Sequence, residues 1–120
     1  MAERVLFISW GEVVRGREIA ALENFNETIG LYGRMQQEGR IESFDVVLFA
    51  PNADMNGCIV LKGSAEQLAA ARDDEEFLRT TADATLVVDD LCLVDGFTNE
   101  GIARQMAIYQ EAIARVPQRA

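Results

Sequence analysis

Residues 5–10 form the stretch VLFISW. It is rich in β-branched and aromatic side chains, is too short for a helix and is followed by Gly11, so it predicts a strand. Residues 58–61, CIVL, predict another strand of the same kind. Over residues 5–8 and 58–61, apolar side chains occupy odd and even positions alike. Both faces of these two strands should therefore be buried.

Between these two strands, residues 17–38 predict a long helix that ends at Gly39. Its apolar residues recur every three or four positions and define one stripe. The stripe consists of Ile19, Leu22, Phe25, Ile29, Tyr32 and Met35. Residues 41–50 predict a second strand, and the turn formers of residues 51–57 join it to residues 58–61 as a hairpin.

After this hairpin, Ser64 and Gln67 fit a capping box at the start of a helix. Acidic side chains at residues 73–76 stand where a second helical start would be, which indicates either one bent helix or two short ones. Residues 84–94 then predict one long fourth strand, with the pair Asp89-Asp90 as the place for a bulge.

A last helix is predicted to begin at Thr98 or Asn99 and to end before Pro117. Its apolar stripe consists of Ile102, Met106, Tyr109, Ile113 and Val116.

The predicted order is strand, helix, strand, strand, helix, strand, followed by one more helix. This order is typical of an α+β, ferredoxin-like βαββαβ domain with an antiparallel sheet, whose two crossover helices share one face. Residues 1–120 are predicted to form a single domain of this kind, because two independent domains would not fit. The first and third strands should be central, and the charged second and fourth strands should be edges.

The sheet face without helices should be apolar, and soluble monomers rarely expose such a patch. We therefore expect a homodimer that buries this face around a two-fold axis. The alternative is a monomer whose own last helix covers the face.

The composition restricts the classes of function. A formal net charge of −9 disfavours binding to nucleic acid or to an anionic membrane. Apolar runs are far shorter than the roughly 20 residues of a membrane span, and the chain enters its first strand without a signal peptide. The sequence has no His, which excludes His-based nucleophile pairs and His-ligated metals. Cys58 and Cys92 are predicted to be free, buried thiols, as in a reducing cytoplasm.

Residues 61–68, LKGSAEQL, together with residues 73–78 and 86–89, resemble the dimeric α/β-barrel superfamily. Members share a strand, a small capped helix with a short acidic step, and a closing strand. The resemblance implies a dimeric α/β barrel. The superfamily includes cofactor-free monooxygenases of the antibiotic-biosynthesis type, haem-degrading enzymes, muconolactone-isomerase-like proteins and proteins without a known activity, so the fold does not choose a reaction. Branches that depend on His are disfavoured.

Several residues are candidates for binding a ligand. Trp10 and Tyr32 would line an aromatic pocket, with core packing as the alternative. Arg15 and Arg17 lie beside the N-terminus of the predicted helix, where guanidinium groups suit an anionic ligand; the alternative is a solvated basic loop.

Two carboxylates are candidate catalytic bases. Asp45 interrupts an apolar parity of the second strand, and Glu12 lies in the loop after the first. The alternative for Asp45 is an edge-strand charge that discourages aggregation. Asn52, Asp54 and Asn56 are interpreted as turn formers and not as a metal site.

Two functions follow as hypotheses. The first is a small-molecule-binding protein or cofactor-independent enzyme, acting on an aromatic or anionic organic ligand, for which we predict no cofactor. The second is a non-catalytic assembly or regulatory module that works through homodimerisation.

Overall fold

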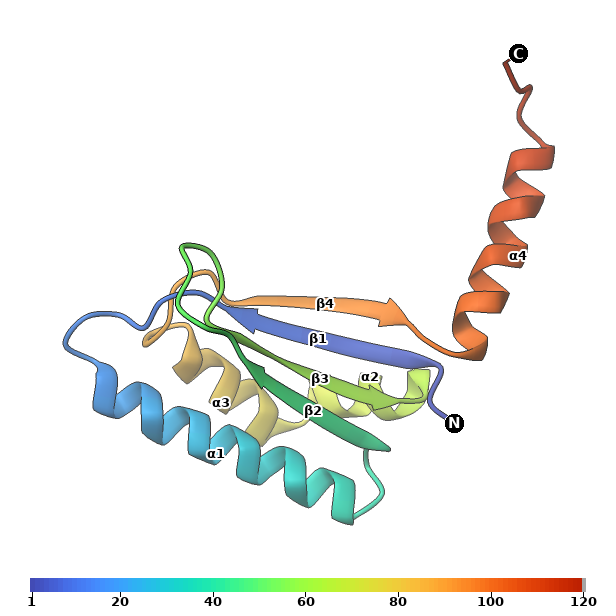
Figure 1. The fold of residues 1–120 in the computed structure, drawn as a ribbon. Coiled ribbons are helices and arrows are strands. Elements are labelled where there is room, and N and C mark those ends of the chain that lie inside the picture. Colours follow the sequence, from blue (N-terminus) through green and yellow to red (C-terminus); the bar gives the residue numbers. More distant parts are fainter. Residues whose placement is uncertain (120) are drawn as a thin grey trace.

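The computed structural model describes residues 1–119 and contains one four-stranded antiparallel sheet (Figure 1). Its strands are β1 (Arg4–Trp10), β2 (Ser43–Leu48), β3 (Gly57–Gly63) and β4 (Cys92–Phe97). The strand order is β2-β3-β1-β4, which confirms that the first and third strands are central. This α+β arrangement is the predicted ferredoxin-like topology.

Three helices cover one face of the sheet (Figure 1): α1 (Glu18–Gln37), α2 (Ala65–Asp73) and α3 (Glu75–Ala84). In the sheet register Leu6 is paired with Leu61 and Ile8 with Ile59, and all four side chains are buried. They pack against buried residues of the three helices and of the connection that follows α1. Those residues are Leu31, Tyr32, Met35, Ile41, Leu68, Ala71 and Phe77.

The break between α2 and α3 is produced by two helix caps. Ser64 Oγ accepts a hydrogen bond from the backbone N–H of Gln67 at 3.1 Å, and Gln67 Oε1 accepts from the Ser64 N–H at 2.9 Å, so the predicted capping box is confirmed. Asp74 has an extended backbone, with ψ of 134°, and its carboxylate accepts from the Phe77 N–H at 3.0 Å. The segment is therefore two short helices.

The hydrogen bond from Phe77 also holds the pKa of Asp74 below its ordinary value, and a second bond from Arg40 lowers it further. The Arg40 guanidinium donates to Asp74 at 2.6 Å.

The predicted strand over residues 84–94 is wrong in its first half. α3 continues to Ala84, and the Val88 N–H still donates to the Ala84 carbonyl at 3.0 Å. The chain then reverses at Asp90, which has a φ of 56°, and β4 begins only at Cys92. The β-branched side chains of this stretch favoured a strand, but helical hydrogen bonds take up its backbone. Only a single bridge joins Val88 to Val13.

The helix that closes the chain, α4 (Glu100–Ala114), ends before Pro117 as predicted. Figure 1 shows it extending away from the body of the domain instead of lying on the sheet. The alternative of a face covered by the chain's own last helix is therefore wrong. Among residues 1–119, none of the helices is both long and apolar enough to cross a bilayer.

The face of the sheet opposite α1, α2 and α3 is left open, and we call it the open face. Strand alternation and the sheet register place one row of residues from all four strands across its middle. The row consists of Asp45, Val60, Phe7 and Val94. A neighbouring row consists of Val47, Cys58, Ser9 and Cys92. Both cysteines are free thiols, as predicted, but only Cys58 is buried; Cys92 is exposed on the edge strand.

Candidate functional site

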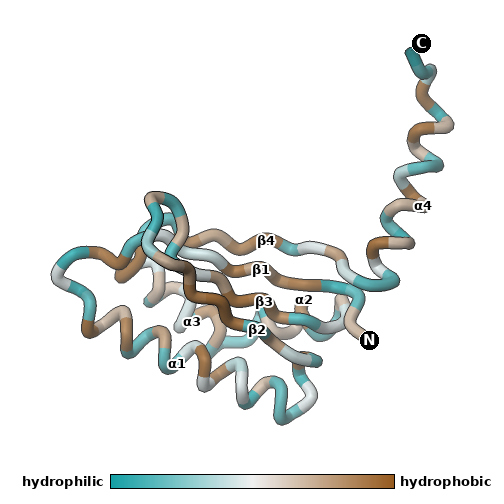
Figure 2. Tube along the Cα trace, viewed as in Figure 1, coloured by the Kyte–Doolittle hydropathy of each residue, from teal (hydrophilic) through white to brown (hydrophobic). Residues whose placement is uncertain are grey.

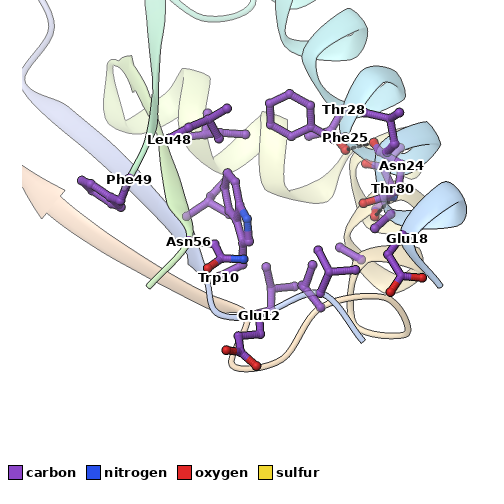
Figure 3. A pocket seen from close by; sticks show the side chains of 18 of the residues that line it. Trp10, Glu12, Glu18, Asn24, Phe25, Thr28, Leu48, Phe49, Asn56 and Thr80 are labelled. Carbon is purple, nitrogen blue, oxygen red and sulfur yellow. Dashed lines mark hydrogen bonds between the residues drawn. The ribbon is translucent and has the colours of Figure 1, made fainter. Parts of the chain in front are cut away.

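A cavity of about 790 Å³ lies between the sheet and the first half of α1 (Figure 3). Its walls come from the end of β1, the loop that follows, α1, the end of β2 with the hairpin loop, and α3. The apolar part of the lining includes Ile8, Trp10, Ala21, Leu22, Phe25, Tyr32, Leu48, Phe49 and Ile59. A space of this size and character is typical of pockets for small organic molecules.

The cavity exists because α1 packs on the sheet over only half of its length. Near its C-terminal end, Leu31, Tyr32 and Met35 are buried. Near its N-terminal end, Ile19 is 78% exposed and Leu22 is 62% exposed. The predicted apolar stripe of α1 is thus buried only in part, because these two of its residues are exposed. Leu22 instead lines the cavity.

Trp10 forms part of the cavity wall at the end of β1. Its indole packs over Gly57 of the neighbouring strand, where a Cβ would lie only 2.8 Å from Trp10 Cζ2. The indole meets the Phe25 ring edge-on, with ring centroids 6.0 Å apart and an interplanar angle of 61°. Such aromatic pairs are favourable beyond the area that they bury. Two aromatic rings from different elements thus form one side of the cavity.

Tyr32 lies where the cavity meets the core. It is 1% exposed, and its ring packs against Phe44 and Phe77 at centroid distances of 6.0 and 6.2 Å. Burial raises the pKa of the Tyr32 phenol above its ordinary value. The phenol therefore stays neutral at physiological pH. In this position it offers an aromatic surface and a neutral hydroxyl, and not a base.

Polar side chains of the lining differ in whether their hydrogen bonds are already made. Asn24 Nδ2 donates to the Thr80 carbonyl at 3.0 Å, and Thr28 Oγ1 donates to the Asn24 carbonyl at 2.8 Å. The Asn56 backbone is bonded to Trp10 and Phe49 on either side. Within residues 1–119 the Asn56 side-chain amide makes no hydrogen bond, and Figure 3 shows it beside the indole of Trp10. A donor and an acceptor are thus available at this wall.

Charged groups stand at the exposed rim. Glu12, Arg15 and Glu18 all line the cavity and are exposed to solvent. The Glu18 carboxylate accepts two hydrogen bonds from the Gly16 N–H, at 3.0 and 3.2 Å, so it is already engaged. In the described part of the chain, neither Glu12 nor Arg15 forms a side-chain ion pair. Both remain free to meet a ligand.

Two of the six predicted site residues lie away from the cavity. Asp45 is on the open face, where its carboxylate forms an ion pair with Lys62 at 2.9 Å. Arg17 precedes α1, and its guanidinium donates to the Leu86 carbonyl, which ties this end of the helix to the segment after α3. The structure brings together the other four residues, Trp10, Glu12, Arg15 and Tyr32.

Other cavity residues were not singled out in the sequence. Phe25 belonged to the predicted stripe of α1, but nothing separated it from core residues. Asn56 was interpreted only as a turn former. The turn itself depends on Asn52, whose Oδ1 accepts from the Asp54 and Met55 N–H groups at 2.9 and 2.8 Å, which confirms the turn interpretation. Over residues 1–119 no group of three or more Cys, Asp or Glu is arranged to hold a metal ion.

The described elements define a ferredoxin-like fold, and comparison with solved structures supports this assignment. The chain is similar to a dimeric protein of unknown function and ferredoxin-like fold from Bacteroides fragilis, with a TM-score of 0.59, 12% identity, and coverage of 79% of this chain and 96% of that one. It is also similar to a putative antibiotic biosynthesis monooxygenase from Chloroflexus aurantiacus (TM-score 0.55, 12% identity, 80% and 93% coverage). A third similar structure is a hydroxynitrile lyase from Passiflora edulis (TM-score 0.61, 11% identity, 83% and 97% coverage).

These similarities confirm the resemblance to dimeric α/β-barrel proteins at the level of the fold. No protein-family model matches the chain, and no curated protein matches it in sequence. The similar structures have different described activities, so the shared fold does not select a reaction.

Proposed function

We propose that this chain binds a small, flat and largely apolar organic molecule in the cavity between α1 and the sheet. The cavity itself, about 790 Å³ with Trp10 and Phe25 on one side, is the observation that carries the proposal. Leu48 and Phe49 are 65% and 43% exposed, although they lie against this space. Apolar side chains that remain exposed around a hollow are typical of a binding site.

The polar groups favour an aromatic ligand that carries one polar substituent. The free amide of Asn56 offers a donor and an acceptor beside the indole, which suits a carbonyl or hydroxyl group on the ligand. Arg15 at the rim suits a carboxylate or another anionic group that projects outward. Arg15 is exposed, so we expect it to improve affinity moderately, as other solvated charge pairs do.

A catalytic role would depend on Glu12. Of the two carboxylates predicted to act as bases, Asp45 is paired with Lys62 on the open face, while Glu12 stands at the rim of the cavity. In an enzymatic version of this proposal, Glu12 takes the proton from an acidic group of the bound molecule and Arg15 orients its anionic end. Binding requires only the apolar walls and Asn56, so it is the function that the geometry supports best.

We propose further that two copies of the chain form a homodimer through their open faces. Phe7, Val60 and Val94 form an apolar row there, and α4 does not cover it. A dimer built in this way also supports the second candidate function, a non-catalytic assembly module. The similar protein from Bacteroides fragilis is described as dimeric, in agreement with this proposal.

A fluorescence titration tests the binding proposal, because Trp10 is the only tryptophan of the chain and lines the cavity. The probes are naphthol, naphthoate and 1-anilinonaphthalene-8-sulfonate. We expect at least one of them to change Trp10 emission saturably and to raise the melting temperature. If none does either, the cavity is not a binding site for this class of molecule.

Two variants of α1 make the test specific. Leu22→Glu places a carboxylate on the cavity wall, whereas Ile19→Glu places one on the same helix but outside the lining. Both side chains are exposed, so neither variant should unfold the domain. Leu22→Glu should weaken probe binding at least tenfold, and Ile19→Glu should leave it unchanged. Equal affinities in the two variants would contradict binding at this site.

A further inference from the structure

The apolar stripe of α4 has no partner within the described chain. Ile102 is 49% exposed, Met106 50% and Tyr109 60%, and Ile113 lies on the same side of the helix. Figure 2 shows hydrophobic positions along a helix that stands clear of the domain. A helix of this length is marginal alone in water, and most of the stability of short helices comes from packing an apolar face. The stripe therefore needs a surface to pack against.

The direction of α4 is set by contacts with the start of β1. Asn99 has a φ of 52°, and its Nδ2 donates to the Ala2 carbonyl at 2.7 Å. Gly101 lies so close to the Glu3 carbonyl that a Cβ would collide with it. One turn later, Arg104 forms an ion pair with the Glu3 carboxylate at 3.0 Å. These contacts hold the helix away from the chain's own sheet, so it cannot turn back onto the open face without breaking them.

The dimensions of the protomer agree with this interpretation. Its radius of gyration is 17.2 Å. A compact chain of this length would have a radius of gyration of about 13.6 Å. Figure 1 shows the reason, which is that α4 projects from the end of β4, beyond the edge of the sheet. The chain has the shape of a domain with an arm.

Charge favours a second copy of this chain as the partner of α4. The whole chain carries a net charge of −9, which opposes self-association over most of its surface. The two apolar surfaces, α4 and the open face, differ from the rest of the chain because their charges are balanced. α4 carries Glu100 and Glu111 balanced by Arg104, and Arg115 directly follows it. On the open face, Asp45 is balanced by Lys62. These two neutral surfaces can meet another copy without repulsion.

We propose that α4 is an arm that packs its apolar stripe against the partner protomer of the homodimer, beside the joined open faces. The arm starts directly after β4, an edge of the open face, so its contact would continue the interface between the two sheets. Two-fold symmetry makes the exchange reciprocal, because each protomer gives one arm and receives one. This inference depends on the proposed homodimer.

Light scattering combined with amide hydrogen exchange tests the arm in the full-length chain. Tyr109→Glu places a carboxylate on the stripe. Ala107→Glu adds the same charge two residues away, on the other side of the helix, and serves as the control. Both positions are exposed in the protomer, so both variants should fold. We expect Tyr109→Glu to weaken dimerisation at least tenfold relative to Ala107→Glu. We also expect the α4 amides of the wild type to become protected as the protein concentration rises.

Each other outcome overturns the inference and identifies what failed. A wild-type mass near 13.3 kDa at all concentrations would contradict both the proposed homodimer and the proposed role of α4. A stable dimer that Tyr109→Glu and Ala107→Glu affect equally would agree with the proposed homodimer and contradict only the proposed packing of α4 on the partner. Protection of α4 that persists where light scattering gives the mass of a monomer would show that the helix packs on its own chain. A dimer in which the α4 amides stay unprotected would contradict packing of the α4 stripe on the partner protomer.

Discussion

Replacing Gly57 with alanine tests how tightly the aromatic wall of the cavity is positioned. The new Cβ would lie 2.8 Å from Trp10 Cζ2 and 2.8 Å from the Val47 carbonyl oxygen. The indole has to move away from the first contact, and the second requires the backbone of the hydrogen-bonded neighbouring strand to shift as well. Overpacking of this kind costs about 1–3 kcal/mol. Alanine also restricts the unfolded chain more than glycine does, which raises the free energy of unfolding by about 0.5–1 kcal/mol. Near the middle of both ranges, the net fall in the free energy of unfolding is about 1–2 kcal/mol.

For a chain of this size, that loss corresponds to a fall in melting temperature of about 4–8 °C. The assay is thermal unfolding followed by circular dichroism, together with the emission spectrum of Trp10. Emission should shift because the indole leaves its edge-on contact with Phe25. Gly33→Ala in α1 is the control: a Cβ there meets nothing within 4 Å, so helix propensity should raise stability by about 1 kcal/mol. If Gly57→Ala is as stable as the wild type and leaves Trp10 emission unchanged, the close packing of Trp10 on Gly57 is refuted.

Three further predictions concern the helix break, the open face and the arm. The folded chain lowers the pKa of Asp74, so its carboxylate adds stability above the ordinary pKa of 3.8 and loses it as the pH falls through the lowered folded value. Asp74→Ala should cost about 1–2 kcal/mol in urea unfolding at neutral pH, and less as the pH falls below 3.8. Val94→Glu should dissociate the dimer in light scattering, whereas Leu86→Glu, also exposed but outside the sheet, should not. Gly101→Ala should displace α4 from Glu3 and weaken dimerisation, measured in the same way.

The topology could be predicted because each of its signals is local. Apolar side chains on both parities of residues 5–8 and 58–61 distinguished the central strands from the charged edges, and the sheet order agrees. The capping box at Ser64 and the turn at Asn52 depend on hydrogen bonds over two or three residues. The strand predicted over residues 84–94 failed because β propensity there competes with helical hydrogen bonds that extend from α3.

The candidate site was harder to predict because it depends on which of the two alternating sets of side chains in a strand faces the helices. In β2, apolar side chains occur on both parities, so the sequence does not distinguish the two faces. The register pairs Asp45 with Val60, on the open face, and places Leu48 toward the cavity. The sequence also could not predict the separation of α1 from the sheet, because an apolar stripe has the same spacing whether it packs against other side chains or against a ligand.

The same alternation separates the two proposed functions on the central strands. In β1, Ile8 and Trp10 line the cavity, while the intervening parity puts Phe7 on the open face. In β3, Ile59 lines the cavity and Val60 is on the open face. Neighbouring positions of one strand thus lie on different surfaces, one lining the cavity proposed to bind a ligand and one on the face proposed to pair with a second copy. Substitutions of strand residues that line the cavity should therefore change ligand affinity without changing the mass of the dimer. Substitutions of strand residues on the open face should lower the mass by dissociating the dimer and leave ligand affinity unchanged. Coupling between the two surfaces would require the strands themselves to move.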